Sequence, residues 1–566
     1  MTSSTSSSPY IWEKNYPSKV SWHKEIPSVP IYTYLEVTRR KFGDRPAFDF
    51  MGKKWTWEQI GEMTDRMAKG LHDVGVEKGV KVGICLPNTP YFLIAYYAIA
   101  KTGATIVNYN PLYSEKELMN QIEDSGTDLM ITCDIKMIYD KMAIMLEKTR
   151  LNQVVMCSFA NILPFPKNLL FPIVKAKEVA AVPNDDRHIK FEKLLSNDGK
   201  FDWPAVDVHN DVALLQYTGG TTGVPKGAML THANLSSNVE QATAWFPEAV
   251  HGQEKMLGVI PFFHVFAMTC VMNFSVKCGF EIIALPKFEL VPTLETISKK
   301  KPHYFPAVPA IYTAINNISD LSKYDLTSLK YCISGGAPLP VEVKKRFEAV
   351  SGCVLVEGYG LTESSPIACI NPTDNTTKSG SIGLPIPGTI VELQNPETGE
   401  LVAQGERGEV CIKGPQVMKG YWNRPEETAH VMRGDFLRTG DIAYMDAEGF
   451  FYIVDRIKDL ILVNGYNVYP RIIEEAIYLH PAVEECIVAG VPDEQRGEVP
   501  KAWVKLKAGQ SLTIDSLKEF LKDKISPIEM PRKVEFREKP LPKTMIGKLS
   551  RKDILVEEKE KIVEPA

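Results

Sequence analysis

The sequence lacks paired cysteines, and this absence excludes several kinds of site. Its ten cysteines are spread along the chain, the closest two being Cys270 and Cys278, and neither a CxxC pair nor a Cys/His ligand spacing occurs. A zinc module or a disulfide framework is therefore not expected. The cysteines are instead predicted to be buried thiols in a reducing compartment.

A strong charge of one sign and a membrane-spanning run are also missing. The formal net charge is −5 and no basic tail is present, so a nucleic-acid partner is not expected. The first residues are rich in serine and threonine without an apolar stretch, which argues against a signal peptide. Residues 256–276 carry no charge, but Pro261, His264 and Asn273 interrupt them, which indicates a buried core segment. These absences predict a cytoplasmic protein.

What is present is typical of a globular protein with more than one domain. The 566 residues are 44% apolar and 24% charged. A helical pattern over 55–72 precedes short apolar runs at 80–86, 105–108 and 129–132, and a buried helix is expected at 91–100. This alternation predicts an α/β fold with doubly wound parallel sheet.

The pattern changes near Tyr452. Residues 471–566 show a smaller, charge-rich α+β pattern with apolar runs of their own. We place a domain boundary, and a hinge, at 455–458. It divides the chain into an N-terminal domain, 1–454, and a C-terminal domain, 459–566.

Residues 161–180 interrupt the alternation of helices and strands. The string NILPFPKNLLFPIVKAKEVA mixes prolines with large apolar residues, and lysines flank it. One interpretation is an irregular surface segment that packs on the core. The other is a patch that touches the inner face of a membrane peripherally.

A glycine-rich loop follows the apolar run at 212–217. It reads TGGTTGVPKG and holds four glycines, three threonines and one lysine. Glycines let backbone N–H groups turn inward around an anion, and Lys226 adds a charge suited to a polyphosphate. The Gly-Lys-[Ser/Thr] of a Walker A motif is absent. The residues expected to bind phosphate are Thr218, Gly219, Gly220, Thr221, Thr222, Gly223 and Lys226.

The string YTGGTTGVPKGAMLTH resembles the signature loop of the acyl-adenylate-forming superfamily, which holds the β- and γ-phosphates of ATP. Further segments follow in the family's order: YCISGGAP, EGYGLTE, TGD, DRIKD and PKTMIGKLSR. With segments before the loop, the resemblance covers almost the whole chain. It implies a large N-terminal domain of doubly wound parallel sheets plus a distorted β-barrel, with a small mobile α+β C-terminal domain.

By this resemblance, YCISGGAP and EGYGLTE form the adenine and metal side of a nucleotide site. Tyr359 stacks on the adenine, because an aromatic face suits a base. The Thr362 hydroxyl bonds the α-phosphate, and Glu363, with Thr218, binds Mg²⁺, which prefers hard oxygen ligands. The other nucleotide-contacting residues of these segments are Gly335, Gly336, Ala337, Glu357, Gly358 and Gly360.

The last three segments supply, by resemblance, the ribose contacts, the hinge and a lysine. Asp441 accepts from both ribose hydroxyls, and Arg456 touches the ribose. Lys548 bridges the carboxylate and the α-phosphate during adenylation, where two anions must approach. Rotation of the small domain then opens a coenzyme A tunnel. The hinge and tunnel residues are Lys458, Gly465 and Tyr466.

Residues 261–268, PFFHVFAM, resemble the family segment beside the acyl pocket. His264 lies there near the carboxylate or phosphate, and a buried histidine held by backbone bonds is the alternative. The apolar neighbours suit a fatty chain, because each buried CH₂ contributes about 0.8 kcal/mol. Met268 stands where some long-chain members have a gating tryptophan. The expected acyl-pocket residues are Phe263, His264, Phe266 and Met268.

The closest resemblance is to bacterial long-chain fatty acid–CoA ligases. It implies that fatty acid and ATP give acyl-AMP and pyrophosphate, and that the acyl group then passes to coenzyme A. Catalysis would depend on Lys548, Thr362, Glu363 and His264. The alternatives are a medium-chain or aryl (4-coumarate-like) ligase, and an acyl-AMP ligase that loads a carrier protein. A non-catalytic lipid-binding scaffold is disfavoured because it has no need of these residues, and a homodimer is left open.

Overall fold

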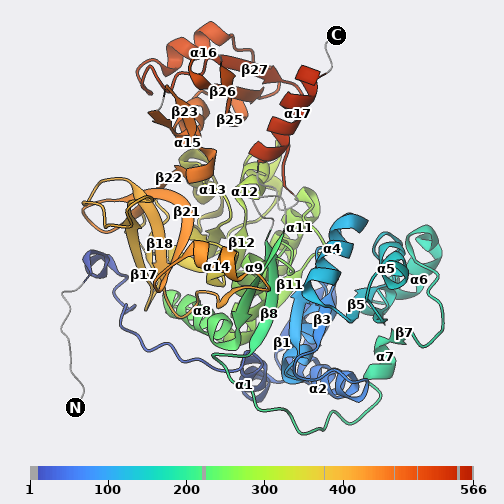
Figure 1. Cartoon of the computed structure of the whole chain (residues 1–566). Coiled ribbons are helices and arrows are strands. Elements are labelled where there is room, and N and C mark those ends of the chain that lie inside the picture. Colours follow the sequence, from blue (N-terminus) through green and yellow to red (C-terminus); the bar gives the residue numbers. More distant parts are fainter. Residues whose placement is uncertain are drawn as a thin grey trace, which may run out of the picture.

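The computed structural model describes residues 10–218, 225–374, 376–464, 466–493, 495–544 and 549–563. Within them the strands form four sheets. Figure 1 shows a small C-terminal domain, orange to red, resting on a larger body that contains the other three sheets. The predicted α/β class, with a large N-terminal domain and a small C-terminal α+β domain, is confirmed.

The first sheet contains the strands predicted at 80–86, 105–108, 129–132 and 212–217, as β3, β4, β5 and β8. Its eight strands run in the order β19-β9-β8-β4-β3-β5-β6-β7, and β3 pairs in parallel with β4 and β5. The helix expected at 91–100 is α3 (Pro90–Lys101), which is buried along its whole length. The strands are β3 (Lys81–Ile84), β4 (Thr105–Asn108), β5 (Leu129–Cys133), β6 (Gln153–Cys157), β7 (His188–Lys190), β8 (Val212–Thr218), β9 (Lys226–Thr231) and β19 (Gly420–Tyr421). Further helices of this region are α2 (Trp57–Asp73), α4 (Glu115–Ser125) and α5 (Lys136–Lys148).

The second sheet has nine strands, ordered β16-β15-β14-β13-β12-β10-β11-β1-β2, and the pairs from β14 to β1 are parallel. The strands are β1 (Pro46–Phe50), β2 (Lys53–Thr56), β10 (Lys255–Gly258), β11 (Glu281–Ala284), β12 (Tyr304–Ala307), β13 (Tyr331–Ser334), β14 (Val354–Gly360), β15 (Ile367–Ile370) and β16 (Leu384–Pro385). Associated helices include α8 (His232–Trp245), α11 (Leu290–Lys300), α12 (Pro309–Asn316) and α13 (Val341–Ser351).

The charge-free segment 256–276 is a core segment, as predicted. After β10 it forms α9 (Val265–Ala267), a π-helical turn η4 (Met268–Asn273) and α10 (Phe274–Cys278), and almost all of their residues are buried. In the described part of the chain, no helix is both long and apolar enough to cross a membrane.

The third sheet corrects one expectation. In place of a distorted β-barrel, five antiparallel strands form an open sheet, ordered β17-β18-β21-β20 with β22 paired to β21. The sheet does not close because, among the described residues, β17 pairs with β18 but with neither β20 nor β22. The strands are β17 (Ile390–Gln394), β18 (Gly408–Lys413), β20 (Met432–Arg433), β21 (Phe436–Met445) and β22 (Phe451–Arg456).

The small domain has apolar clusters of its own, separate from the main core. One buried cluster includes Ile473 and Leu517, and the other includes Trp503 and Ile554. The strands are β23 (Ile461–Val463), β24 (Tyr466–Val468), β25 (Val483–Asp493), β26 (Gly497–Leu506) and β27 (Lys533–Arg537), and the helices are α15 (Pro470–Tyr478), α16 (Ile514–Leu521) and α17 (Arg551–Val563). Separate cores support the predicted division of the chain, while the boundary at 455–458 stays a prediction.

Candidate active site

A cavity of about 2100 Å³ lies between the two domains. Its lining comes from the carboxyl ends of β8, β13 and β14, from the third sheet, and from α15 and the start of α17. The sequence-predicted residues that line it are Thr218, Lys226, Phe263, His264, Phe266, Gly335, Gly336, Ala337, Glu357, Gly358, Tyr359, Gly360, Thr362, Glu363, Asp441, Arg456 and Lys458. Segments far apart in the sequence therefore meet at one place.

Two other predicted residues do not line the cavity. Contrary to expectation, Met268 is buried in the core, because it begins the π-helical turn η4 and its sulfur accepts from Asn108 Nδ2 at 3.6 Å. Tyr466 begins β24 and is 68% exposed. The predicted residues Gly219, Gly220, Thr221, Thr222, Gly223, Gly465 and Lys548 lie outside the described residues. The nearest described neighbours of Lys548, Thr544 and Leu549, both line the cavity.

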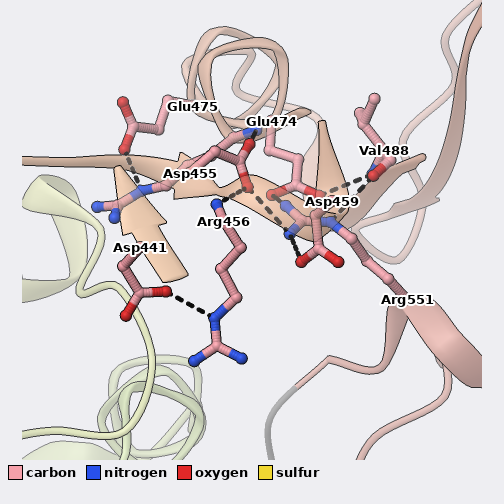
Figure 2. A network of polar contacts seen from close by, with 9 residues as sticks. Asp441, Asp455, Arg456, Asp459, Glu474, Glu475, Val488 and Arg551 are labelled. Atoms are coloured by element: carbon pink, nitrogen blue, oxygen red, sulfur yellow. Dashed lines mark hydrogen bonds and ion pairs between the residues drawn. The ribbon is translucent and has the colours of Figure 1, made fainter. Parts of the chain in front are cut away.

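The carboxylate of Asp441 lies at the centre of a polar group in the cavity wall. The Tyr359 hydroxyl donates to its Oδ2 at 2.6 Å, and Arg456 Nε donates to its Oδ1 at 2.9 Å. Arg456 stands opposite Asp441 in the pairing of β21 with β22, which fixes this contact (Figure 2). Burial and the Asp441 charge raise the pKa of Tyr359 well above its usual value, so this hydroxyl remains a donor.

Glu363 has a neighbour that sequence reasoning missed. The Tyr421 hydroxyl donates to Glu363 Oε1 at 2.6 Å, and Tyr421 itself lines the cavity. Burial and the Glu363 carboxylate raise the pKa of Tyr421, so it too stays protonated. Glu363 lies in η6 (Thr362–Ser364), just after β14. Glu363 and its neighbour Thr362 both line the cavity.

Lys226, the lysine of the glycine-rich loop, is held at the first residue of β9. Its Nζ lies 2.6 Å from Glu427 Oε2 in α14 (Pro425–Val431) and 5.3 Å from the centre of the Tyr421 ring. Glu427 was also missed by sequence reasoning. An anion that binds Lys226 must therefore share or replace an existing carboxylate partner.

The glycines of the expected adenine pocket occupy crowded positions. A Cβ on Gly335 would lie 3.1 Å from the Phe266 ring, and one on Gly360 would lie 1.9 Å from the carbonyl oxygen of Pro366. Gly336 has φ of +84°, which favours glycine. Neighbouring protein atoms thus disfavour a side chain at Gly335 and Gly360, and the backbone conformation favours glycine at Gly336.

Glu357 lies at the same end of β14 and is almost fully buried. The Leu339 N–H donates to its Oε1 at 3.2 Å. Burial raises the pKa of Glu357 to about 7, and the positive charge of Arg471 opposes this rise only in part. Glu357 is thus a buried acid whose charge changes near neutral pH.

His264 makes the backbone contact that one of the two interpretations expects, and its role beside a substrate carboxylate stays a prediction. It stands before α9, and its Nδ1 accepts from the Phe266 N–H at 3.2 Å. It also lines the cavity. The backbone contact orients the ring, which is compatible with a role beside a substrate carboxylate.

A buried apolar lining extends the cavity into the core. An aromatic cluster forms part of it: the ring centre of Phe246 lies 5.8 Å from that of Phe274 and 5.9 Å from that of Tyr304. Except for Phe274, these residues were not singled out from the sequence, because they come from separate elements that meet only in the fold. The buried apolar lining residues include Ala242, Phe246, Met256, Cys270, Phe274 and Tyr304.

The described side chains offer few ligands for a metal ion. Among the described residues, no group of three histidine, cysteine, aspartate or glutamate side chains could hold a metal ion. Glu363 is the cavity carboxylate nearest to the Thr362 hydroxyl in sequence, and Thr218 adds a further hydroxyl to the lining. A cation bound here would take most of its ligands from a phosphate and from water.

Comparison with known proteins agrees with this geometry. The family model described as AMP-binding enzyme matches residues 35–422, and the model described as AMP-binding enzyme C-terminal domain matches residues 472–548. A long-chain-fatty-acid–CoA ligase of Bacillus subtilis (strain 168) is 44% identical over 97% of this chain and 98% of its own length. The protein of the same name from Escherichia coli O157:H7 is 35% identical over 98% and 99%.

A solved structure supports the same assignment. ATP-bound MatB from Rhodopseudomonas palustris superposes with a TM-score of 0.81 at 26% identity, over 94% of this chain and 100% of that one. The family models cover both domains, and the two sequence relatives span nearly the full length. The resemblance read from the motifs is confirmed, and the chain belongs to the AMP-binding, acyl-adenylate-forming enzyme family.

Proposed function

We propose that the protein is an AMP-forming long-chain fatty acid–CoA ligase. The observation that carries this proposal is one continuous cavity. Asp441, Tyr359 and Lys226 line it, and so do buried aromatic residues. Such a cavity can hold a nucleotide and an apolar chain together. The names of the two bacterial relatives, at 44% and 35% identity, point to the same substrate.

In this proposal ATP binds with its adenine between Tyr359 and the turn at 335–337, and with its ribose on Asp441. Lys226 and the glycine-rich loop receive the terminal phosphates, and Thr362 receives the α-phosphate. The fatty-acid carboxylate lies near His264 and attacks the α-phosphorus, so that pyrophosphate leaves. Lys548 offsets the negative charge that develops where the two anions meet.

Mg²⁺ is proposed to bind through Glu363 and Thr218. Glu363 accepts from the neutral Tyr421 hydroxyl, and among the described residues no lysine or arginine forms an ion pair with it, so its oxygens suit a hard cation. When bound, the ion would neutralise phosphate charge during the displacement. Glu363 and Tyr421 would orient it.

The two half-reactions are proposed to use two arrangements of the domains 1–454 and 459–566. Lys458 in η7 (Ile457–Asp459) is the proposed pivot, directly after β22. The exposed position of Tyr466 on β24 leaves it free to face a coenzyme A tunnel, with Gly465, after rotation. A thiolate then attacks the acyl carbonyl and AMP leaves.

The test is AMP formation with coenzyme A across a ladder of fatty acids, with an aryl acid and an acyl-carrier protein as further arms. We expect the highest kcat/KM with long chains and free coenzyme A. A maximum with medium-chain or aryl acids, or with the carrier protein as the only acceptor, would select one of the alternative ligases. Acyl-CoA binding without turnover would instead support the non-catalytic scaffold.

A peripheral membrane contact is the second part of the proposal. Residues 167–174 form a helix, α6 (Lys167–Val174), rather than an irregular segment. Phe171 attaches it to the large domain, with its ring centre 5.3 Å from that of Phe159. The outward side chains are 49–79% exposed: Phe165, Leu169, Leu170, Ile173 and Val174.

This apolar face, flanked by Lys167, Lys175 and Lys177, fits the boundary of an anionic lipid surface. A cytoplasmic protein that docks there would receive a membrane-borne fatty acid directly.

The test is flotation with vesicles containing phosphatidylglycerol. It compares wild type with the double variant Leu169→Ser/Ile173→Ser and, as a control, with Leu401→Ser, a change at an exposed leucine near the third sheet. We expect the double variant alone to lose at least about 10-fold in binding. Equal vesicle binding by wild type and both variants would contradict the proposed membrane contact. The homodimer remains a prediction.

A further inference from the structure

Arg551 makes contacts that the proposed mechanism does not use. It is the first residue of α17, and its guanidinium reaches three elements (Figure 2). Nη2 lies 2.7 Å from Glu474 Oε2 in α15, Nη1 lies 3.0 Å from Asp459 Oδ2, and Nε donates to the Val488 carbonyl at 3.0 Å. All three nitrogens of the fork are therefore engaged.

A fourth contact crosses the proposed hinge. Arg551 Nη1 also lies 3.5 Å from Oδ1 of Asp455, which stands near the end of β22, at the first residue of the proposed hinge. Asp455 is buried, and its other oxygen accepts from the backbone N–H of Arg471 in α15 at 2.7 Å. Its Oδ1 also accepts from the Arg456 N–H at 2.8 Å. Asp455 thus joins the end of β22 to the small domain.

Arg551 is the positive partner of three carboxylates that are largely buried. The Asp455 side chain is 2% exposed, and those of Glu474 and Asp459 are 15% and 22% exposed. Burial raises the pKa of Asp455 and of Glu474, and the Arg551 charge opposes both shifts. Removing the guanidinium would leave buried carboxylates without their partner, which is costly.

We infer that Arg551 is a positioning residue for the adenylation step. It fixes the start of α17 to the hinge segment, and Lys548 precedes it by only three residues in the sequence. Thr544 and Leu549, on either side of the segment with Lys548, line the cavity. Arg551 therefore anchors the chain three residues after Lys548 in the sequence, close to residues that line the cavity. The inference rests on the proposed role of Lys548.

The contacts of Arg551 divide according to the hinge. Asp459, Glu474 and Val488 belong to the small domain, and they accompany Arg551 when this domain rotates. Asp455 lies in β22, before the proposed pivot Lys458, so rotation about Lys458 would break its contacts with Arg551 and with the Arg471 N–H. Loss of Arg551 should therefore affect the step that uses Lys548 more than the step that follows rotation.

The test measures the half-reactions separately: pyrophosphate exchange with ATP and fatty acid, and acyl-CoA formation from supplied acyl-AMP. Misplacing a catalytic group by about 1 Å costs on the order of 100-fold in rate. We expect Arg551→Ala to slow exchange by about that factor and acyl-CoA formation by less than about 3-fold. Arg551→Lys should recover part of the exchange rate, because it keeps the charge but not the fork.

The control is Arg537→Ala. Arg537 Nη2 lies 2.8 Å from Glu557 Oε2, so this variant also removes an arginine contact to α17, but away from the hinge. We expect it to change both half-reactions equally and slightly. Equal losses in both half-reactions for Arg551→Ala, or the same pattern for Arg537→Ala, would overturn the inference.

Two further variants distinguish a folding defect, and a failure of the proposed function, from a failure of the inference about Arg551. If Arg551→Ala does not fold, Arg551→Lys decides the question, and wild-type rates in both half-reactions for that variant would overturn the inference. Lys548→Ala is measured in parallel. Normal exchange in Lys548→Ala would contradict the proposed function itself, whereas lost exchange there with normal exchange in Arg551→Ala would contradict only the role of Arg551.

Discussion

Tyr359 donates its hydroxyl to Asp441 across 2.6 Å, so one oxygen of the proposed ribose acceptor already has a protein partner. The other oxygen is bonded to Arg456 at 2.9 Å. Tyr359 and Arg456 thus hold the carboxylate in one orientation before ATP binds. This arrangement reduces the cost of ordering the acceptor when the ribose arrives.

Asp441→Asn tests the ribose contact. The amide can accept at one atom only, so we expect the KM for ATP to rise by about 10- to 100-fold, as for the loss of a hydrogen bond to a charged group. Tyr359→Phe serves as the control, because it leaves the carboxylate in place and removes only its orienting partner. It should raise the KM by a smaller factor. Equal KM values for Asp441→Asn and wild type would contradict the ribose assignment.

The Lys226–Glu427 pair predicts a competition with ATP. Glu427→Gln removes the carboxylate 2.6 Å from Lys226 Nζ, and we expect the KM for ATP to fall up to about 5-fold, since a partly exposed pair contributes at most about 1 kcal/mol. The adjacent Glu426→Gln is the matched control, since Glu426 is exposed in the same helical turn. Initial rates against ATP concentration measure the effect. A raised KM in Glu427→Gln would mean that Glu427 assists ATP binding instead.

Glu357 predicts a pH dependence of stability. Its pKa is about 7 in the folded protein, above its ordinary value of 4.5. The folded state therefore keeps the proton that the unfolded chain releases, and this stabilisation is complete below about pH 4.5 and lost as the pH rises through about 7. Glu357→Gln stays neutral and avoids the loss.

We expect the stability of Glu357→Gln relative to wild type to increase by on the order of 3 kcal/mol between about pH 4.5 and about 8. The Gln side chain can still accept from the Leu339 N–H, so the comparison isolates the charge. Melting temperatures of both proteins across this range provide the measurement. Parallel curves would show that Glu357 does not titrate there.

Ala242 on α8 predicts control of chain length, because it lines the apolar part of the cavity with Phe246 four residues later. Ala242→Leu should occupy space in this apolar part of the cavity. We expect kcat/KM for the longest acids to fall by about 4-fold for each CH₂ that no longer fits, while shorter acids are spared. Ala244→Leu is the control: it is buried in the same helix but does not line the cavity. A shifted chain-length profile in both variants would contradict this role.

The sequence predicted local elements well where one pattern dominates. The run at 105–108 is β4, and the expected helix at 91–100 is α3, because an apolar segment bounded by turns has few other solutions. The motif residues Asp441 and Tyr359 also meet as expected in one cavity. The fold brings their two strands together, and the distance between the two residues in the sequence does not predict this proximity.

Other features could not be predicted because they arise from tertiary contacts. Tyr421 and Glu427 come from a segment with no distinctive pattern and reach Glu363 and Lys226 only in the fold. Met268 was placed by its distance from His264, but the π-helical turn that begins at Met268 directs its sulfur to Asn108. The open third sheet likewise depends on strand pairing that composition does not specify.

The central claim is that the cavity forms an acyl-adenylate before coenzyme A takes part. The most direct test is the exchange of pyrophosphate into ATP, with Mg²⁺ and a long-chain fatty acid but without coenzyme A, in wild type and Lys548→Ala. The account predicts fatty-acid-dependent exchange in wild type and its loss in Lys548→Ala, with acyl-CoA formation from supplied acyl-AMP retained. Exchange that does not require the fatty acid, or equal exchange in the two proteins, would contradict it.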